Sequence, residues 1–303
     1  MSVSTAPPGA PSRRRSVPGA KVAAGLRRVA RSPAGAFGLL VVAALLVVAI
    51  LAPVLAPHDY AAIDVPRRLE GPSSDYWLGT DHLGRDLLSR LIGGVRIALR
   101  IAVPAVLIGL AIGLVVGLVA GYVGRWVDTV AVVVMDAIQS FPAVILALTV
   151  LALLGGSATN IIVVIAIAFV PGFARVTRAA VQSIKQNTYI DAERNLGAGT
   201  ARIILRHVLP NIVAPLLVLT AMDLPGAIAI ESGLAFLGLG VQPPTPDWGV
   251  ILSDGFERIS LSPWPVLWTC LLLAFVTLGF TFLGERLRDV LDVRTDDSPA
   301  SSR

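Results

Sequence analysis

Apolar stretches long enough to cross a lipid bilayer dominate this chain. With windows of about 19 residues that tolerate glycine and proline, six segments qualify, at roughly 36–56, 98–122, 130–154, 159–180, 212–239 and 265–284. A membrane-spanning helix needs about 20 mostly apolar residues. The sequence therefore predicts an all-α polytopic membrane protein with about six transmembrane helices.

The composition supports this fold class. Hydrophobic residues make up 55% of the chain and charged residues only 15%, whereas soluble proteins carry about 25% charged residues. The net charge of +5 could suggest a nucleic-acid partner, but the basic residues flank apolar segments instead of forming a stripe on a polar module. We therefore expect the lipid bilayer as a partner and no nucleic acid.

Residue types that catalysis and metal binding require are scarce. Cys270 is the only cysteine, and the three histidines are scattered at His58, His82 and His207, so neither a disulfide framework nor a metal site is expected. The motif G-x-x-x-x-G-K-[ST] is missing, because neither Lys21 nor Lys185 is followed by Ser or Thr. No G-x-S-x-G elbow occurs either. The sequence predicts no catalytic residue and no enzyme activity of this chain alone.

Basic residues before the first apolar stretch indicate the orientation. No acidic residue appears before Asp59, while this region contains Arg13, Arg14, Arg15, Lys21, Arg27, Arg28 and Arg31. The positive-inside rule places the N-terminus in the cytoplasm, and six crossings return the C-terminus there. The first span could be a cleaved signal peptide, but it exceeds the usual apolar region of about 7–15 residues, so a retained anchor is favoured. The 23 arginines against two lysines, with much Ala, Val and Gly, suggest a GC-rich bacterial gene. The expected location of such a membrane protein is the bacterial cytoplasmic membrane.

The spans divide the chain into three parts. Residues 1–33 are rich in Pro, Ser, Ala and Arg without an apolar period, which predicts a disordered basic cytoplasmic tail. Residues 34–294 form the transmembrane domain, and residues 295–303 form a C-terminal cytoplasmic tail. Within the domain, about 57–97 should be extracytoplasmic and about 181–211 should be a cytoplasmic loop.

The extracytoplasmic segment contains an amphipathic pattern. Apolar residues recur at helical spacing from Leu83 to Val95, which predicts a helix along the membrane surface with Thr80 or Asp81 as its N-cap. Five arginines in this segment run against the positive-inside rule: Arg67, Arg68, Arg85, Arg90 and Arg96. Acidic residues nearby offset their charge.

A strip of glycines marks the second span. Gly109, Gly113, Gly117 and Gly121 follow one another at intervals of four residues, so they share one side of a helix. Helices in lipid associate through close van der Waals packing, which small residues permit. We expect a second helix to pack closely on this strip, although glycine is also simply common in membrane helices.

Polar side chains inside the predicted spans are Asp136, Gln139, Asp223 and Glu231. An aspartate at mid-helix costs about 2.5–3.5 kcal/mol on insertion scales, so these residues are candidates for the translocation pathway. Positions near the span ends, or hydrogen bonds that join helices, are the alternative interpretation. A proton-coupled transporter would use such residues as well.

The stretch 189–211 reads YIDAERNLGAGTARIILRHVLPN and is polar enough to leave the bilayer. Its pattern predicts a short exposed helix, a turn that glycine permits around Gly197 and Gly199, and a second helix leading into the fifth span. A solvated loop needs no such order, so a partner-docking element is favoured.

The residues of this stretch resemble the membrane permease subunits of binding-protein-dependent ABC importers. The family signature is E-A-A, three residues, Gly, nine residues and an apolar-Leu-Pro tail. Asp191-Ala192-Glu193, Gly197 and His207-Val208-Leu209-Pro210 fit this spacing, with Asp191 in place of Glu and Glu193 in place of the second Ala. LGTDHLGRDLLSRLIGGVR from Leu78, ESGLAFLGLGVQPPTPDWG from Glu231 and LGERLRDVLDVR from Leu283 are similar to the dipeptide, oligopeptide and nickel branch, and to the second of its two permeases.

This resemblance, over about 36–294, implies a type I ABC importer permease fold and an ATP-driven importer of dipeptides or oligopeptides. It implies a second homologous permease, two cytoplasmic P-loop ATPase subunits or one fused ATPase, and an extracytoplasmic substrate-binding protein. ATP and magnesium would bind the partner subunits, with no cofactor in this chain. The implied ATPase-coupling residues are Tyr189, Asp191, Ala192, Glu193, Leu196, Gly197, His207, Leu209 and Pro210.

Three alternatives stay open from the sequence. Nickel or another small solute is an alternative cargo within the same branch. A proton-coupled secondary transporter could work through Asp136, Asp223 and Glu231, although no inverted repeat is found. A membrane scaffold without transport activity is the third class.

Overall fold

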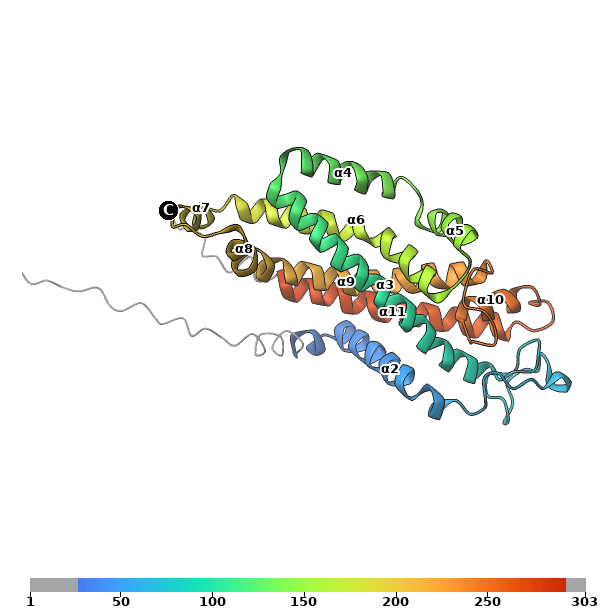
Figure 1. The fold of residues 1–303 in the computed structure, drawn as a ribbon. Coiled ribbons are helices and arrows are strands. Elements are labelled where there is room, and N and C mark those ends of the chain that lie inside the picture. Colours follow the sequence, from blue (N-terminus) through green and yellow to red (C-terminus); the bar gives the residue numbers. More distant parts are fainter. Residues whose placement is uncertain (1–26, 293–303) are drawn as a thin grey trace, which may run out of the picture.

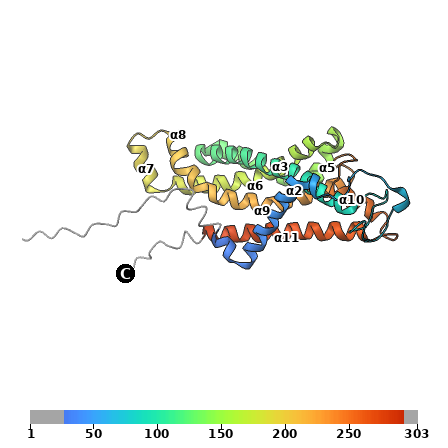
Figure 2. The same ribbon diagram turned by 90° about the horizontal axis from the view of Figure 1, so that it is seen from below.

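The predicted all-α membrane fold class is confirmed by the computed structural model, which describes residues 27–292. Among these residues, five helices are long and apolar enough to span a membrane, and a bent pair could supply a sixth span. The five are α2 (Pro33–Leu55), α3 (Leu87–Val123), α6 (Ala158–Lys185), α9 (Leu209–Phe236) and α11 (Trp264–Asp292). Helices α6, α9 and α11 run side by side along one direction, and α2 is inclined to them, as Figures 1 and 2 show.

The expected third span is broken rather than straight. Helix α4 (Arg125–Gln139) and helix α5 (Ala143–Leu154) meet at an angle of 83° around residues 140–142. Pro142 explains the break, because proline lacks an amide hydrogen and restricts the residue before it to extended conformations. The predicted span at about 130–154 is therefore two helices joined at a bend, which together could still form the sixth span.

The amphipathic pattern between residues 83 and 95 belongs to a transmembrane helix instead of a separate surface helix. Helix α3 runs without interruption over 37 residues, and its N-cap is Asp86, whose carboxylate accepts a hydrogen bond from the Ser89 amide at 3.0 Å. Asp81 instead holds a turn, because its Oδ1 accepts hydrogen bonds from the amides of Leu83 and Arg85. Since nothing breaks the helix after residue 95, the two predicted segments merge.

Helices α3 and α6 form the centre of the bundle, and the glycine strip lies at their contact. A Cβ atom added at Gly113 would lie 2.5 Å from the Phe173 Cβ atom, and one added at Gly117 would lie 2.5 Å from the Ala174 carbonyl oxygen. Gly109 and Gly121 face the same helix. The backbones approach so closely that any side chain at these positions would displace α6.

Helix α2 packs mainly on α11 and also contacts α3. The Phe37 ring makes edge-to-face contacts with Phe275 and Phe282, at centroid distances of 5.5 and 5.9 Å. The other side of α2 stays exposed, as at Ile50 (76%) and Val54 (82%). An apolar face of this kind suits contact with lipid.

Short elements occupy both ends of the bundle. Helices α7 (Thr188–Asn195) and α8 (Thr200–Ile203) lie at one end, whereas α10 (Trp248–Phe256) and the segment 56–86, which includes η1 (Val65–Arg67), lie at the other. We call these the α7 end and the α10 end. The polar stretches of the sequence thus gather at the two ends, and the apolar helices run between them.

The predicted terminal tails fall mostly outside the described residues, because the structure describes neither 1–26 nor 293–303. Residues 27–31 are helical, and Ser32 caps α2 by accepting a hydrogen bond from the Gly35 amide at 3.1 Å. The sequence predicted that the domain starts at residue 34, and regular structure therefore begins earlier than predicted.

Candidate functional site

The stretch 189–211 projects from the bundle at the α7 end (Figure 1). Helix α7 is followed by a turn, by α8, and by a π-helical segment (η2, Ile204–Val208) that continues into α9. Ile190, Ile203 and Val208 are buried beneath this element. The three apolar anchors hold the element on the bundle, so it forms an ordered projection rather than a free loop.

Gly197 gives the turn its shape. Its φ angle is +83°, a left-handed conformation that residues with a Cβ atom rarely adopt, and a Cβ atom there would meet nothing within 4 Å. The amides of Gly197 and Ala198 donate hydrogen bonds back to the carbonyls of Arg194 and Glu193, at 2.9 and 3.0 Å. These bonds close the C-terminus of α7, so the glycine is required by backbone conformation and not by crowding.

Side chains connect the two halves of the element. Glu193 Oε1 lies 3.4 Å from His207 Nε2, and the Tyr189 ring lies 5.8 Å from the His207 ring. The end of α3 supports the same element: the Tyr122 hydroxyl is hydrogen-bonded to Thr200 Oγ1 at 3.3 Å. These contacts tie α7 to the helix that continues into the membrane.

Exposed residues on this element could meet a partner. Leu196 and Leu205 are 86% and 66% exposed. Asp191 forms only a loose pair with Arg194 at 3.4 Å, and the other residues of the predicted set are exposed at Ala192 or lie in the first turn of α9 at Leu209 and Pro210. Exposed large apolar side chains beside charges are typical of an interaction surface.

Two of the four polar residues in the predicted spans lie together. Asp136 and Gln139 on α4 both accept hydrogen bonds from the guanidinium of Arg175 on α6. The side chains of Asp136 and Arg175 are 58% and 46% exposed. Charged groups exposed at membrane depth require water or a partner chain next to them, so this cluster is the stronger candidate for a pathway wall.

The other two polar residues lie elsewhere, on α9. Glu231 is 1% exposed and interacts with the buried carboxyl of Asp247, the N-cap of α10. Asp223 is half-buried and forms no hydrogen bond or ion pair with any residue in the described part of the chain. The structure therefore does not gather Asp136, Asp223 and Glu231 into one relay.

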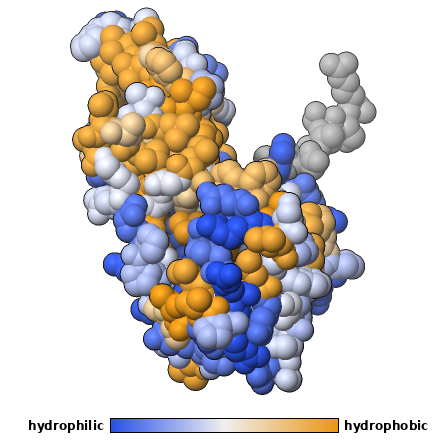
Figure 3. Space-filling model, turned by 90° about the vertical axis from the view of Figure 1, so that its right-hand side faces the viewer, coloured by the Kyte–Doolittle hydropathy of each residue, from blue (hydrophilic) through white to orange (hydrophobic). Residues whose placement is uncertain are grey.

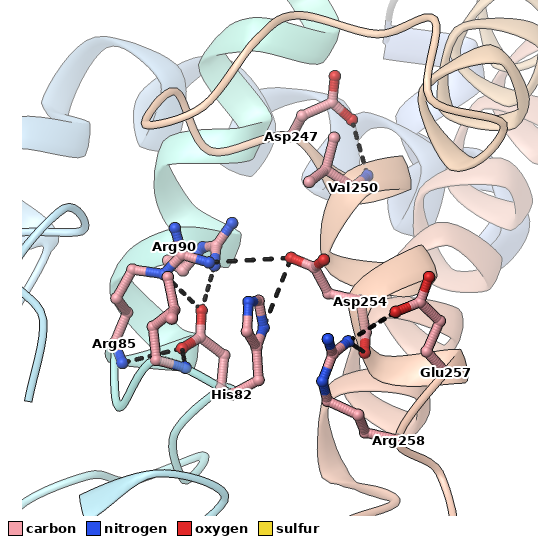
Figure 4. Close-up of polar contacts among 10 residues, drawn as sticks. His82, Arg85, Arg90, Asp247, Val250, Asp254, Glu257 and Arg258 are labelled. Atoms are coloured by element: carbon pink, nitrogen blue, oxygen red, sulfur yellow. Dashed lines mark hydrogen bonds and ion pairs between the residues drawn. The ribbon is translucent and has the colours of Figure 1, made fainter. Parts of the chain in front are cut away.

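A polar cluster at the α10 end escaped the sequence reasoning. Asp81 accepts hydrogen bonds from Arg85 Nε at 2.7 Å and from Arg90, and all three residues are at most 5% exposed. Asp254 on α10 lies 3.8 Å from Arg85 and 3.6 Å from His82 (Figure 4). Two of the five arginines that run against the positive-inside rule, Arg85 and Arg90, thus have a structural role, because this cluster joins the start of α3 to α10.

Electrostatics explain why this cluster tolerates burial. Burial by itself raises the pKa of Asp81, but the neighbouring Arg90 and Arg85 lower it further, so the net pKa lies below the ordinary value. Burial raises the pKa of Asp247 above its ordinary value, against the effect of amide hydrogen bonds from Gly249 and Val250. Asp81 is thus held as the anion between two cations.

The surface at the α10 end is divided. Figure 3 looks onto this end and shows hydrophilic residues interspersed with hydrophobic patches over the lower part, and an almost continuous hydrophobic surface over the lobe above it. That lobe contains α5, on which Ile145, Leu153 and Leu154 are more than half exposed. A hydrophobic flank beside a polar cap is the pattern of a protein that emerges from a membrane at this end.

Comparisons with known proteins agree with this architecture. Residues 113–297 match the family model for the binding-protein-dependent transport system inner membrane component. Residues 24–72 match the N-terminal TM domain of oligopeptide transport permease C. The two matches together cover α2 and the bundle from the last third of α3 onward, and they leave residues 73–112 unmatched.

Two curated relatives cover most of the chain. The dipeptide transport system permease protein DppC of Alkalihalophilus pseudofirmus is 38% identical over 255 residues, which is 84% of each chain. The glutathione transport system permease protein GsiD of Pectobacterium atrosepticum is 39% identical over 268 residues, which is 88% of each chain. Among solved structures, the MetNI methionine ABC transporter in an inward-facing conformation gives a TM-score of 0.53 at 20% identity, covering 67% of this chain and 97% of the other. This last similarity shows the fold alone.

Proposed function

Because the chain belongs to the family of binding-protein-dependent transport system inner membrane components, it is a permease subunit of an ABC importer, and we propose that it forms the membrane pathway for short peptides. The chain is itself a membrane component and not an enzyme. Membership in this family does not favour the secondary carrier or the scaffold that the sequence left open.

The relatives support peptides as the cargo. One relative is a dipeptide permease and another transports glutathione, itself a peptide. Nickel and other small solutes remain the alternative within the branch. The match to the permease C model supports assignment as the second permease of a pair.

Family membership implies ATPase partners and a substrate-binding protein in general. Beyond that, our proposal pairs this chain with a second, homologous permease above two ATPase subunits or one fused ATPase, where ATP and magnesium bind. The observation that carries the coupling role is the ordered projection at the α7 end, with exposed Leu196 beyond the Gly197 turn. On this proposal α7 sits in a cleft of the ATPase.

The proposed mechanism is rigid-body switching. ATP binding draws the ATPases together, α7 moves with them, and the spans rock so that the pathway opens to one side at a time. Such coupling requires ATP and the binding protein to interact differently with the two states, and we expect both to favour the outward-open form. The Asp136–Arg175 pair would line the pathway during this motion.

The proposed orientation places the α7 end in the cytoplasm and the α10 end outside, with both termini cytoplasmic in the bacterial inner membrane. The basic residues at 13–31 and the arginines around 189–211 support it. Two of the outer arginines that disagree with the positive-inside rule, Arg85 and Arg90, are buried in ion pairs, so these two are weaker evidence about topology.

Uptake of labelled dipeptide, glutathione and nickel by host cells with and without the gene tests the cargo. Loss of dipeptide uptake on deletion, restored by the wild-type gene but not by Gly197→Val, is the expected result. Loss of nickel uptake alone would replace the peptide cargo with a metal chelate. Unchanged uptake of all three solutes would contradict both assignments.

A further inference from the structure

A cleft opens between the outer parts of α2 and α3 at the α10 end. Its volume is about 780 Å³. The last turn of α2 and the first third of α3 form its walls, and the loop around Pro246 closes one side, where a Cβ atom on Gly93 would lie 2.6 Å from the Pro246 ring. Its polar lining consists of His58, Asp59, Tyr60, Ser89, Arg96, Arg100 and Thr245.

Two arginines in this cleft are unpaired. Arg96 and Arg100 lie one helical turn apart on α3, both are exposed, and neither makes a hydrogen bond or ion pair with another described residue. Four other arginines at the α10 end form ion pairs with acidic side chains: Arg67, Arg85, Arg90 and Arg258. The cleft thus carries positive charge that the protein does not neutralise.

The position of the cleft relative to the bilayer suggests what neutralises the charge. Ala52 and Pro53, in the last turn of the membrane-spanning helix α2, line the same cleft as the two arginines. Farther along α3, Leu107 and Val115 are 49% and 59% exposed on the side away from α6. The arginines therefore lie where an apolar, lipid-facing surface ends, at the level of the headgroups.

The chemistry of the cleft favours an anion with a phosphate group. Guanidinium groups bind phosphate oxygens through paired, charge-assisted hydrogen bonds. Within the cleft, Asp59 is the only acidic side chain against the two arginines, and His58 faces Asp86 at 3.4 Å. The excess positive charge favours a headgroup with a net negative charge over a zwitterionic one. Basic pockets between membrane helices are a known kind of lipid site.

We propose that this cleft binds the headgroup of an anionic phospholipid in the leaflet at the α10 end, with Arg96 and Arg100 holding the phosphate oxygens. The acyl chains then lie along the exposed apolar faces of α2 and α3. The proposal is independent of the cargo, because it needs only the cleft and its depth in the membrane.

The test measures lipid binding to the purified full chain in mild detergent by native mass spectrometry. Phosphatidylglycerol and phosphatidylcholine are titrated onto the wild type, onto Arg96→Gln/Arg100→Gln and onto the charge-preserving Arg96→Lys/Arg100→Lys. Loss of both charges should weaken phosphatidylglycerol binding about thirtyfold, whereas the lysine variant should lose only a few-fold. Arg68→Gln is the matched control, because Arg68 is exposed and unpaired but lies outside the cleft.

Four results would overturn the proposal. Unchanged phosphatidylglycerol binding by the folded glutamine variant, checked by size-exclusion chromatography, would show that the arginines do not hold the lipid. Equal binding of phosphatidylcholine would remove the preference for an anion. Displacement of the lipid by dialanine would assign the cleft to a peptide carboxylate. Binding by the lysine variant as weak as by the glutamine variant would show that positive charge alone does not hold the lipid, and would overturn the argument from excess charge.

Discussion

Glu193 and His207 face each other across the turn between α7 and α8, with Oε1 and Nε2 3.4 Å apart. The family signature has a small residue where this chain has Glu193. The carboxylate points toward a histidine 14 positions along the chain, so it does not crowd the packing beneath α7, where Ile190 is the buried residue. The substitution is therefore accommodated by a new contact.

We expect Glu193→Ala to keep most activity. The pair is partly exposed, at 33% and 21% for the two side chains, and ion pairs of this kind contribute about 0–1 kcal/mol. Uptake by the alanine variant should stay within about twofold of the wild type. A complete loss of uptake would show that Glu193 itself contacts the partner.

Gly197→Val should uncouple ATP hydrolysis from transport while membrane insertion stays normal. Valine at a φ angle of +83° costs about 1–3 kcal/mol of backbone strain, which the chain would relieve by reshaping the turn and moving α7. The measurement compares substrate-stimulated ATPase activity and uptake of the assembled transporter. Gly199→Ala is the matched control, because its φ of −69° suits alanine and a Cβ atom there meets nothing within 4 Å. Normal coupling in the valine variant would refute the docking assignment.

Gly117→Ala should destabilise the contact between α3 and α6. The added Cβ atom would lie 2.5 Å from the Ala174 carbonyl oxygen and 2.6 Å from the Thr177 Cβ atom, and overpacking of this kind costs about 1–3 kcal/mol. Thermal unfolding in detergent should show a lower midpoint. Gly172→Ala, inside α6 with nothing within 4 Å, should be neutral or stabilise by about 0.5–1 kcal/mol. Equal midpoints for both variants would mean that the helices do not approach closely here.

Asp81→Asn should strongly destabilise the folded structure at the α10 end. It leaves Arg90, which is 1% exposed, without its charge partner, and breaking a buried ion pair costs about 3–5 kcal/mol. Asp75→Asn is the control, because Asp75 pairs with Arg67 but is 63% exposed. A small loss of stability for Asp81→Asn, similar to the loss for the control, would contradict a structural role for the cluster.

The same variant should change the response to acid. The folded-state pKa of Asp81 is lowered, so its pairing stabilises the protein above the unfolded pKa of about 3.9, and that contribution is lost as the pH falls through the lower folded-state pKa. The thermal unfolding midpoint of the wild type should decrease as the pH is lowered through this range. The midpoint of Asp81→Asn should depend less on pH. Parallel pH profiles for the two proteins would argue against the pairing.

Local sequence signals determined most of the fold and the projecting element at 189–211. Hydropathy located the five long spans, and the Gly-rich turn around Gly197 was visible in the residues alone. The break before Ala143 was also encoded locally, by Pro142, but prolines inside α6 and α9 do not break those helices. The effect of a proline depends on the packing around it, so the sequence did not separate these cases.

Tertiary structure alone decided which polar groups meet. Trp248 Nε1 donates a hydrogen bond to the Leu91 carbonyl 157 positions away, and this contact places α10 against α3 and next to the Asp81 cluster. The same packing leaves Arg96 unpaired in its cleft. Hydropathy and turn preferences depend on neighbouring residues in the chain, whereas ion pairing and exposure depend on which helices pack together. The sequence by itself therefore determined the spans and the turn, and only the folded bundle decided the partners.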